Sequence, residues 1–480
     1  MEEYRVCNER YRIRLGYLPT RRNSGLSKAE AGRQKREIEE FLRTNYADRI
    51  TLVTIDELNE EGIILDPTDA TRAADIFQRA HVDAIFAPHC NFGTEDAVAK
   101  TGKLVGKPLL LWGPRDEAPD ERGFRLRDTQ CGLFATSKAL LRYGVPFTYI
   151  TNSELKSETF RRGLEDFLAV ACVVKNFTGM RVGQIGVRPT PFTSVMCNES
   201  ELLEKFGIEV VPTSVAEVVR DVYATIEAAE EEYSKTLTYL QENFRYLSAS
   251  EMGLEKTAGL IVVIRKWARE KKIDTIAIQC WNAMNKGLGI YPCVASAVLT
   301  DEGLPISCET DVHGAISLMM LAAASMGKTA FLADLTVRHP EDDNVELLWH
   351  CGNFPPSLST GGNELTDKGS HPCGVAAHWE IKGGDITVAR MDGLNGRYQL
   401  LMGEAEGISG PPNVGTYLWT RFNDWPQWEN RFIYGPYIHH LGVVHGKFSH
   451  ILYGACRYIK GLEPDAVYPE EESLKKMLLY

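Results

Sequence analysis

The segment from residue 83 to residue 112, DAIFAPHCNFGTEDAVAKTGKLVGKPLLLW, decides the fold class. It contains an apolar strand over Asp83–Ala87, a helical pattern over Glu95–Leu104 and a second apolar strand over Lys107–Trp112. Strands that alternate with helices predict parallel β–α–β units. In sheets built from such units, ligands bind beyond the carboxyl ends of the strands.

The same alternation precedes this segment. Tyr11–Leu18 and Ile50–Thr54 have strand character, and Ser27–Asn45 and Asp69–His81 have helical spacing. We therefore predict an N-terminal α/β domain over residues 1–175. Its strands end at three stretches where a ligand could bind, which are Pro19–Asn23, His89–Glu95 and Trp112–Arg115.

A second α/β domain is predicted over residues 176–345. Arg181–Val187, Asp274–Gln279 and Thr329–Leu335 are apolar strands, and helices such as Val312–Met326 separate them. The fold class is therefore α/β, with two doubly wound α/β domains in this part of the chain.

The sequence pattern changes after Val345, where Gly-Gly pairs, turns and alternating residues dominate. Ala377–Lys382, Asp385–Met391 and Gly396–Met402 alternate as strands of antiparallel sheets do. We expect residues 346–480 to form a C-terminal, mainly antiparallel β domain that is barrel-like.

Composition excludes several classes of partner. The 480 residues include 53 Lys plus Arg and 65 Asp plus Glu, so the formal net charge is −12 and nucleic acid is not an expected partner. No run of 18 apolar residues predicts a membrane span, and the charged start MEEYRVCNERYR lacks the apolar region of a secretion signal. The 11 cysteines form no CxxC pair, which is typical of reduced thiols and predicts a cytoplasmic protein.

Two acidic residues follow or end apolar strands. Glu309 lies in ISCETDVHG (Ile306–Gly314), just after a short strand, and Asp334 ends the strand in AFLAD. Taken alone, each fits an ordinary capping or turn role beside a helix N-terminus. Parallel neighbouring strands would bring both carboxylates within reach of one divalent ion, and oxygen-rich sites suit Mg²⁺ or Mn²⁺.

Histidines near the end of the chain provide further candidate ligands. His439, His440, His445 and His450 lie within 12 residues, and their spacing is not that of an HExxH helix, so we expect one or two of them at most to bind a metal. His350, in LWHCGN, is either a packed histidine or a site residue.

Weaker candidates for substrate binding lie at other predicted strand ends. Arg21 and Arg22, with Arg14 upstream, are either part of a solvated loop or a site for an anionic or polyhydroxyl ligand. Trp281 and Asn91 follow predicted strands and are either packing and turn residues or residues that face the ligand crevice.

The order of these motifs resembles that of the L-fucose isomerase and L-arabinose isomerase superfamily. PISCETDVHG (Pro305–Gly314) is similar to the segment whose glutamate binds the metal, and FLADLTV (Phe331–Val337) to the segment with the second metal-binding acid. His445, in Val444-His-Gly446, falls where the family has its metal histidine, and His350 is similar to a histidine near the site in part of the superfamily. Leu18–Arg22 is similar to a segment of the fucose enzymes in which an arginine reaches the substrate of a neighbouring subunit.

The resemblance implies an aldose–ketose isomerase that works through an enediol. Its divalent metal, Mn²⁺ first and Mg²⁺ or Co²⁺ as alternatives, would be bound by Glu309, Asp334 and His445. Glu309 and Asp334 would be the catalytic acid and base, and Arg21, Arg22, Arg14, His350, Trp281 and Asn91 would contact the sugar. The family also implies a homo-oligomer, commonly a hexamer, with sites between subunits.

Three hypotheses remain open at this point. An isomerase could act on a fucose-like or arabinose-like sugar, or on an anionic sugar such as a sulfonated hexose, since Arg14, Arg21 and Arg22 supply positive charge. A non-catalytic sugar-binding protein and a metal-dependent aldolase on the same scaffold are the two rivals.

Overall fold

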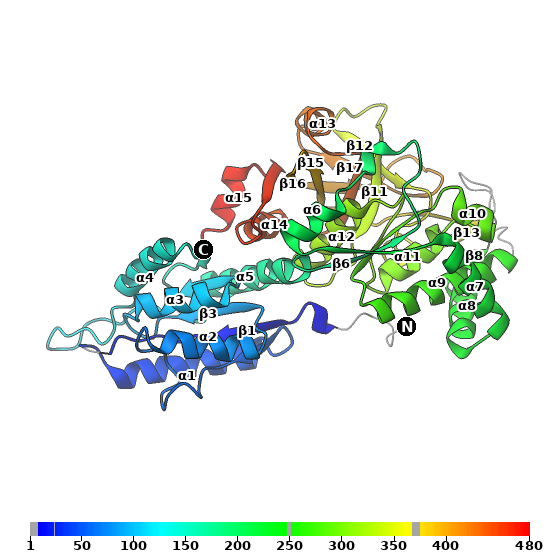
Figure 1. The fold of residues 1–480 in the computed structure, drawn as a ribbon. Coiled ribbons are helices and arrows are strands. Elements are labelled where there is room, and N and C mark those ends of the chain that lie inside the picture. The colour runs from blue at the N-terminus through cyan, green and yellow to red at the C-terminus, as the bar shows by residue number, and fades with distance from the viewer. Residues whose placement is uncertain (1–7, 24, 247–250, 367–374) are drawn as a thin grey trace. The chain divides into compact units, whose positions relative to one another are not determined.

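The computed structural model describes residues 8–23, 25–246, 251–366 and 375–480 (Figure 1). The chain forms two compact units. The N-terminal unit comprises Asn8–Lys175 together with the end of the chain, Glu472–Tyr480, and the C-terminal unit comprises Asn176–Glu471.

The N-terminal unit contains a five-stranded parallel sheet in the order β2-β1-β3-β4-β5. This order reverses between β1 and β3, which is the topological switch point where doubly wound folds bind ligands. The prediction of a doubly wound domain is confirmed here. The strands are β1 (Ile13–Tyr17), β2 (Ile50–Val53), β3 (Ala84–Pro88), β4 (Leu109–Trp112) and β5 (Phe147–Tyr149).

Helices cover both faces of this sheet. On one face α2 packs against α3 and α3 against α4, and on the other Phe41 of α1 meets Phe160 of α5 with their ring centroids 6.0 Å apart. Trp112 and Phe86 of the sheet extend this aromatic cluster. The helices are α1 (Lys28–Asn45), α2 (Asp69–Arg79), α3 (Glu95–Val105), α4 (Thr129–Tyr143) and α5 (Glu158–Phe177).

The C-terminal unit begins with a second parallel sheet, in the order β10-β9-β6-β7. Its strands are β6 (Arg181–Ile185), β7 (Glu209–Thr213), β9 (Thr275–Ile278) and β10 (Ile306–Ser307). Six helices accompany these strands, namely α6 (Glu199–Phe206), α7 (Val215–Ala228), α8 (Glu231–Asn243), α9 (Glu251–Lys271), α10 (Ala283–Leu288) and α11 (Cys293–Asp301).

A closed barrel forms the rest of this unit, as the alternating pattern predicts. Strands run in the order β16-β15-β18-β11-β12-β17, and an additional β16–β17 pairing closes the ring. The barrel strands are β11 (Phe331–Arg338), β12 (Val345–His350), β15 (Gly384–Leu394), β16 (Arg397–Ile408), β17 (Thr416–Phe422) and β18 (His440–His445). Further strands extend the sheet, namely β8 (Arg245–Tyr246), β13 (Glu364–Thr366), β14 (Ala376–Glu380) and β19 (Leu462–Tyr468), and helices α13 (Trp425–Tyr434) and α14 (Ser449–Cys456) complete this unit. Helix α15 (Glu471–Met477), apart from its first residue, belongs to the N-terminal unit.

One expected strand belongs to a different sheet from the one predicted. The segment that was expected to continue the parallel sheet, Thr329–Leu335, contributes to β11, which is antiparallel to both β12 and β18 in the barrel. Of these two partners, β12 follows β11 directly in the chain, but β18 begins only at His440, so the local apolar pattern of β11 cannot distinguish the two sheets. The predicted domain boundary at residue 345 stays a prediction.

Helix α12 (Val312–Ala324) joins the parallel sheet to the barrel. All 13 of its residues are buried, and it packs against β9 on one side and against β15 and β18 on the other. A helix that is apolar all round is typical of a position between two layers. The N-terminus of α12 therefore lies where the carboxyl ends of the parallel strands meet the barrel.

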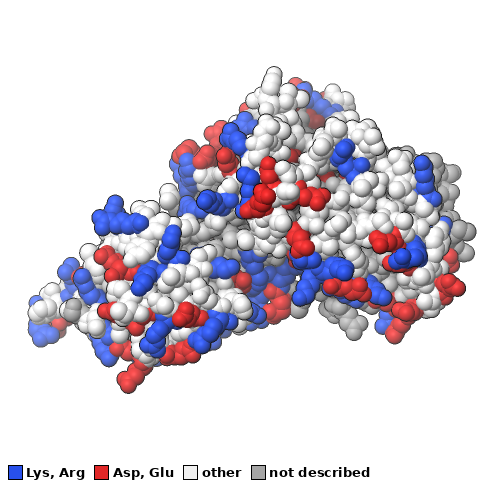
Figure 2. All heavy atoms as spheres, in the orientation of Figure 1, with Lys and Arg blue, Asp and Glu red and all other residues white. Residues whose placement is uncertain are grey.

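Charged side chains of both signs are interspersed over most of the face shown in Figure 2. Many form short-range pairs, as Arg33 does with Glu30 and Glu37 on α1. In the part of the chain that is described, no helix is both long and apolar enough to cross a bilayer.

Two helical glycines of the N-terminal unit provide a test of its packing. A Cβ atom on Gly132 of α4 would lie 1.7 Å from the carbonyl oxygen of Phe92, whereas one on Gly32 of α1 would meet only the end of the Arg36 side chain at 3.4 Å. Gly132→Ala should therefore destabilise the fold by about 1–3 kcal/mol or more. Gly32→Ala should instead stabilise it by about 0.5–1 kcal/mol, because alanine favours a helix interior. Calorimetric unfolding of both variants checks this, and equal shifts in melting temperature would contradict the packing of α4 on the loop after β3.

Candidate functional site

Glu309 is held in an unusual backbone conformation just after β10. Both Glu309 and Thr310 have positive φ angles, 53° and 56°, which non-glycine residues adopt at an energetic cost. The Thr310 N–H donates to the carbonyl of Ile278, and the side chain of Asp311 then caps α12 by accepting from the Gly314 N–H at 3.0 Å. The strand end and the helix cap together fix the position of the Glu309 carboxylate, which is buried.

Three residues of the barrel face this carboxylate. Asp334 in β11 pairs with His440, the first residue of β18, and His350 ends β12. The His440 Nε2 lies 3.5 Å from Asp334 Oδ1 and 3.8 Å from Glu309 Oε2. The His350 Nε2 lies 3.9 Å and 3.7 Å from the same two oxygens. Two carboxylate oxygens and two imidazole nitrogens therefore converge on one point, and we call Glu309, Asp334, His350 and His440 the central cluster.

The facing atoms of the central cluster lack ordinary partners. Glu309 Oε2, Asp334 Oδ1 and His350 Nε2 are buried and form no hydrogen bond among the described residues. Buried polar atoms without partners are rare, because each costs free energy. Separations of 3.5–3.9 Å are too long for hydrogen bonds, but they suit ligand atoms arranged around a small cation. The donor set therefore fits a divalent metal ion.

The electrostatics of the cluster also favour a cation. Burial raises the pKa of the Glu309 carboxyl, but His350 and His440 outweigh burial and the net shift is downward. Burial lowers the pKa of His440, but Asp311, Asp334 and Glu309 outweigh it and the net shift is upward. The carboxylates thus create a negative potential at a buried point, which attracts positive charge.

A buried network of charges lies behind His440. The Nδ1 of His440 is 2.9 Å from Asp311 Oδ2, and Arg390 forms an ion pair with the same oxygen. Arg390 is fully buried and also pairs with Asp392 at 2.8 Å. The Nδ1 of His313 lies 3.1 Å from Asp392 Oδ1. Burial opposes the ionisation of Asp311, but Arg390 and His440 outweigh it and hold the pKa of that carboxyl well below its usual range.

Aromatic rings lie beside the cluster. Trp281 stacks on Phe192 with their centroids 5.7 Å apart, and Phe192 lies 5.4 Å from the ring of His440 and 5.9 Å from that of His439. Trp281 is a candidate from its position after a predicted strand, whereas Phe192 lies in no motif that would identify it from the sequence. His439 is exposed, and one of its ring nitrogens lies within 4.8 Å of ligand atoms of Asp334 and His440.

His445 does not belong to the central cluster, contrary to the position that the resemblance implies. It ends β18, pairs with Ile386, and its Nε2 lies 2.7 Å from the carbonyl oxygen of Lys382. His440 and His445 are five residues apart in one strand, so they are separated by about 16 Å and their side chains point to opposite faces. His440 occupies the position expected for His445.

The arginine candidates of the N-terminal unit differ in their environments. Arg21 is buried and forms two hydrogen bonds of 2.8 Å with Glu61, so its charge is neutralised within the fold. It lowers the pKa of the Glu61 carboxyl to about 2, against the opposing effect of burial. Arg22 is exposed, and its guanidinium stacks over the ring of Phe92 at 4.1 Å. Arg14 lies near the amino end of β1, away from the carboxyl ends of the strands.

Asn91 is a buried turn residue. Its Oδ1 accepts hydrogen bonds from the N–H of Arg22 at 2.7 Å and from the N–H of Gly93 at 3.1 Å. It therefore joins the loop after β1 to the loop after β3 at the switch point of the sheet. Of the two roles predicted as alternatives for Asn91, a turn residue or a substrate contact, these bonds correspond to the turn role, and one of them holds the backbone of Arg22 in place.

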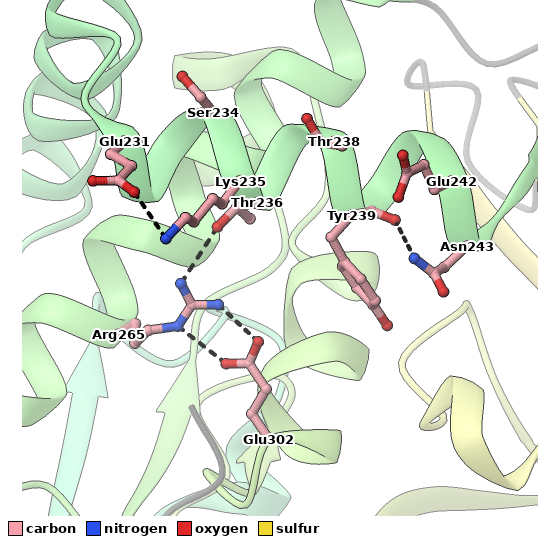
Figure 3. Close-up of a pocket in the computed structure, with 10 residues that line it drawn as sticks. All are labelled: Glu231, Ser234, Lys235, Thr236, Thr238, Tyr239, Glu242, Asn243, Arg265 and Glu302. Carbon is pink, nitrogen blue, oxygen red and sulfur yellow. Dashed lines mark hydrogen bonds and ion pairs between the residues drawn. The ribbon is translucent and has the colours of Figure 1, made fainter. Parts of the chain in front are cut away.

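A separate cavity of about 750 Å³ opens beside α8 (Figure 3). Its charged centre is Arg265, which pairs with Glu302 at 2.7 Å and with Glu232 at 3.0 Å. The cavity lining includes no residue of the central cluster. Because its arginine is already neutralised by two carboxylates, the cavity does not offer an obvious site for a charged ligand.

Comparisons with known proteins agree with the resemblance in the sequence. Residues 16–178 match the family described as fucose/sulfoquinovose isomerase, N-terminal domain. Sulfoquinovose isomerase of Priestia aryabhattai is 25% identical over 402 residues, which cover 82% of this chain and 86% of that protein. Sulfoquinovose isomerase of Alkalicoccus urumqiensis is 24% identical and covers 68% of this chain and 73% of that protein.

A solved ABC transporter solute-binding protein from Burkholderia multivorans also matches, with 15% identity over 66% of this chain and 94% of that chain. The TM-score of this match is only 0.16, so it contributes nothing to the assignment.

Proposed function

We propose a substrate and a cofactor for this chain, which is a fucose isomerase-like family member and an aldose–ketose isomerase. The proposed substrate is sulfoquinovose, a sulfonated hexose, and the proposed cofactor is a divalent cation bound at the central cluster. The observation that carries the proposal is the convergence of four ligand atoms, three of them buried without partners.

Glu309, Asp334 and His440 would hold the cation. Two carboxylates and an imidazole suit Mn²⁺ best, with Mg²⁺ or Co²⁺ as alternatives. The cation, when bound, supplies Lewis acidity that makes the proton on the carbon beside the carbonyl easier to remove. His440 replaces His445 in the expected ligand set because only His440 lies beside the two carboxylates.

Glu309 and Asp334 would move the proton between C2 and C1 of the sugar. Glu309 and Asp334 each present one carboxylate oxygen to the same point. One of the two residues is therefore placed to remove the proton from carbon, and the other to assist proton transfer between the sugar oxygens. General acid–base catalysis of this kind contributes about 10²–10⁴-fold to the rate. Burial of the cluster and the neighbouring rings of Trp281 and Phe192 limit access of water to the enediol.

Arg22 is the proposed contact for the sulfonate. It is exposed and held in place by the Asn91 bond to its backbone, whereas Arg21 is committed to Glu61. A guanidinium recognises a sulfonate through charge-assisted hydrogen bonds, as it does a carboxylate or phosphate. In the family arrangement, this arginine would reach a sugar bound by a neighbouring subunit, so we also propose a homo-oligomer, with a hexamer expected. A cytoplasmic location is part of the same proposal.

Measurements of metal binding distinguish the roles of His440 and His445, the two histidines of β18. His440→Gln and Glu309→Gln should each weaken Mn²⁺ binding by at least about 10–100-fold, because each removes a facing ligand atom. His445→Gln should leave binding unchanged, since its ring lies on the opposite face of the strand. To measure this, the folded protein is first stripped of metal with EDTA and then titrated with Mn²⁺. Free Mn²⁺ is quantified at each step from its electron paramagnetic resonance signal. Weakened binding in His445→Gln but not in His440→Gln would contradict the proposed site.

Recognition of the sulfonate is tested by Arg22. Arg22→Gln should lower kcat/KM for sulfoquinovose about 10–100-fold, because a hydrogen bond to a charged group contributes about 1.5–3 kcal/mol. The same variant should change kcat/KM for the neutral sugar glucose far less. Arg14→Gln serves as the matched control, since Arg14 lies near the other end of β1. Equal losses on both sugars, or turnover of fucose or arabinose in preference to sulfoquinovose, would contradict the substrate assignment.

A further inference from the structure

The two buried histidines of the central cluster form different hydrogen bonds through Nδ1. The Nδ1 of His440 lies 2.9 Å from Asp311 Oδ2, a carboxylate oxygen that also forms an ion pair with the buried guanidinium of Arg390 and therefore acts as an acceptor. The hydrogen of the His440 ring therefore belongs on Nδ1. The Nε2 of His440 is left with a free lone pair that points at Glu309 and Asp334.

The bonding of His350 is the reverse. The backbone N–H of Cys351 donates to His350 Nδ1 at 2.9 Å. A backbone amide has no other role than donor, so Nδ1 of His350 must carry a lone pair, and the hydrogen of the neutral ring belongs on Nε2. That N–H is buried, points into the cluster and has no acceptor within hydrogen-bond distance among the described residues.

We infer that the fold holds these two histidines in opposite tautomers, so that His440 binds the cation and His350 donates a hydrogen bond to the substrate. The inference rests on the proposed function, and it assigns different roles to two residues whose Nε2 atoms lie at similar distances from the same carboxylates. Asp311 is then a positioning residue, because it acts on the cation only through His440.

His350 would donate from Nε2 to a sugar oxygen that becomes negatively charged as the C2 proton leaves. A fixed donor at such an oxygen is worth about 10²–10³-fold in kcat. The ring of His350 is buried and accepts a hydrogen bond from the Cys351 amide, and it lies parallel to the ring of Trp349, with the ring planes 6° apart and the centroids separated by 6.2 Å. The donor is therefore aimed before the substrate arrives.

The nitrogen ligands of bound Mn²⁺ provide the direct test. Electron spin echo envelope modulation of the Mn²⁺ protein detects directly ligated nitrogen, and ¹⁵N-histidine labelling identifies it as histidine. The expected result is one histidine nitrogen in the unsubstituted protein, which is lost in His440→Gln and retained in His350→Gln. Two ligated histidine nitrogens, or loss of the nitrogen signal in His350→Gln, would overturn the tautomer assignment but not the proposed cofactor. Failure of the unsubstituted protein to bind Mn²⁺ would overturn the proposed cofactor as well.

Kinetics distinguish a donor from a structural role of His350. His350→Leu should lower kcat about 10²–10³-fold with unchanged Mn²⁺ affinity, and His350→Gln, which retains an N–H donor, should recover part of that loss. If Gln is no better than Leu, or if both variants lose Mn²⁺, His350 is not a donor to substrate.

The role of Asp311 is tested with a matched pair of variants. Asp311→Asn keeps the size and the helix cap but can present an N–H to His440, so it should weaken Mn²⁺ binding about 10–100-fold. Asp392→Asn removes a charge from the same Arg390 network without touching His440, and should have much less effect. Equal Mn²⁺ affinities in the two variants would overturn the positioning role of Asp311.

Discussion

The arrangement of the site is built on the contacts of one buried group, the carboxylate of Asp311. One of its oxygens caps α12 and the other meets both His440 and Arg390, so a single buried side chain connects the parallel sheet, the central helix and the barrel. A buried carboxylate is stable only when charges and hydrogen bonds compensate it. Arg390 provides that charge through its Nη1. The Nη2 of the same guanidinium pairs with Asp392.

This arrangement explains why a buried charge network accompanies a catalytic cluster. Pairing Asp311 and Arg390 costs desolvation energy that an apolar core would avoid. In return, the ring of His440 has one orientation and one tautomer, with its free lone pair toward Glu309 and Asp334. Strain at Glu309, which adopts a positive φ angle, has the same purpose of fixing a functional atom.

Much of the fold and the two acidic residues could be predicted from the sequence, because apolar runs and their ends are local signals. The structure places Glu309 and Asp334 beside the same two imidazole rings, but not through the parallel strands that were expected to bring them together. Asp334 is on an antiparallel strand of the barrel rather than on a parallel neighbour of β10. Choosing His440 over His445 required the register of β18 against β11, which pairs Asp334 with His440. No local pattern encodes that register. Arg390 and Phe192 gave weaker signals still, since one is a charge within an apolar strand and the other a single ring in a loop.

The proposed transfer of the C2 proton can be followed by the exchange of that proton with solvent. Sulfoquinovose would be incubated with the Mn²⁺-loaded protein in D₂O and followed by NMR, with Glu309→Gln as the inactive comparison. We expect deuterium at C2 of the recovered aldose together with formation of the ketose, and neither with Glu309→Gln. Ketose formation at an undiminished rate with Glu309→Gln, or no exchange at all in the protein with bound Mn²⁺, would contradict the proposed proton transfer.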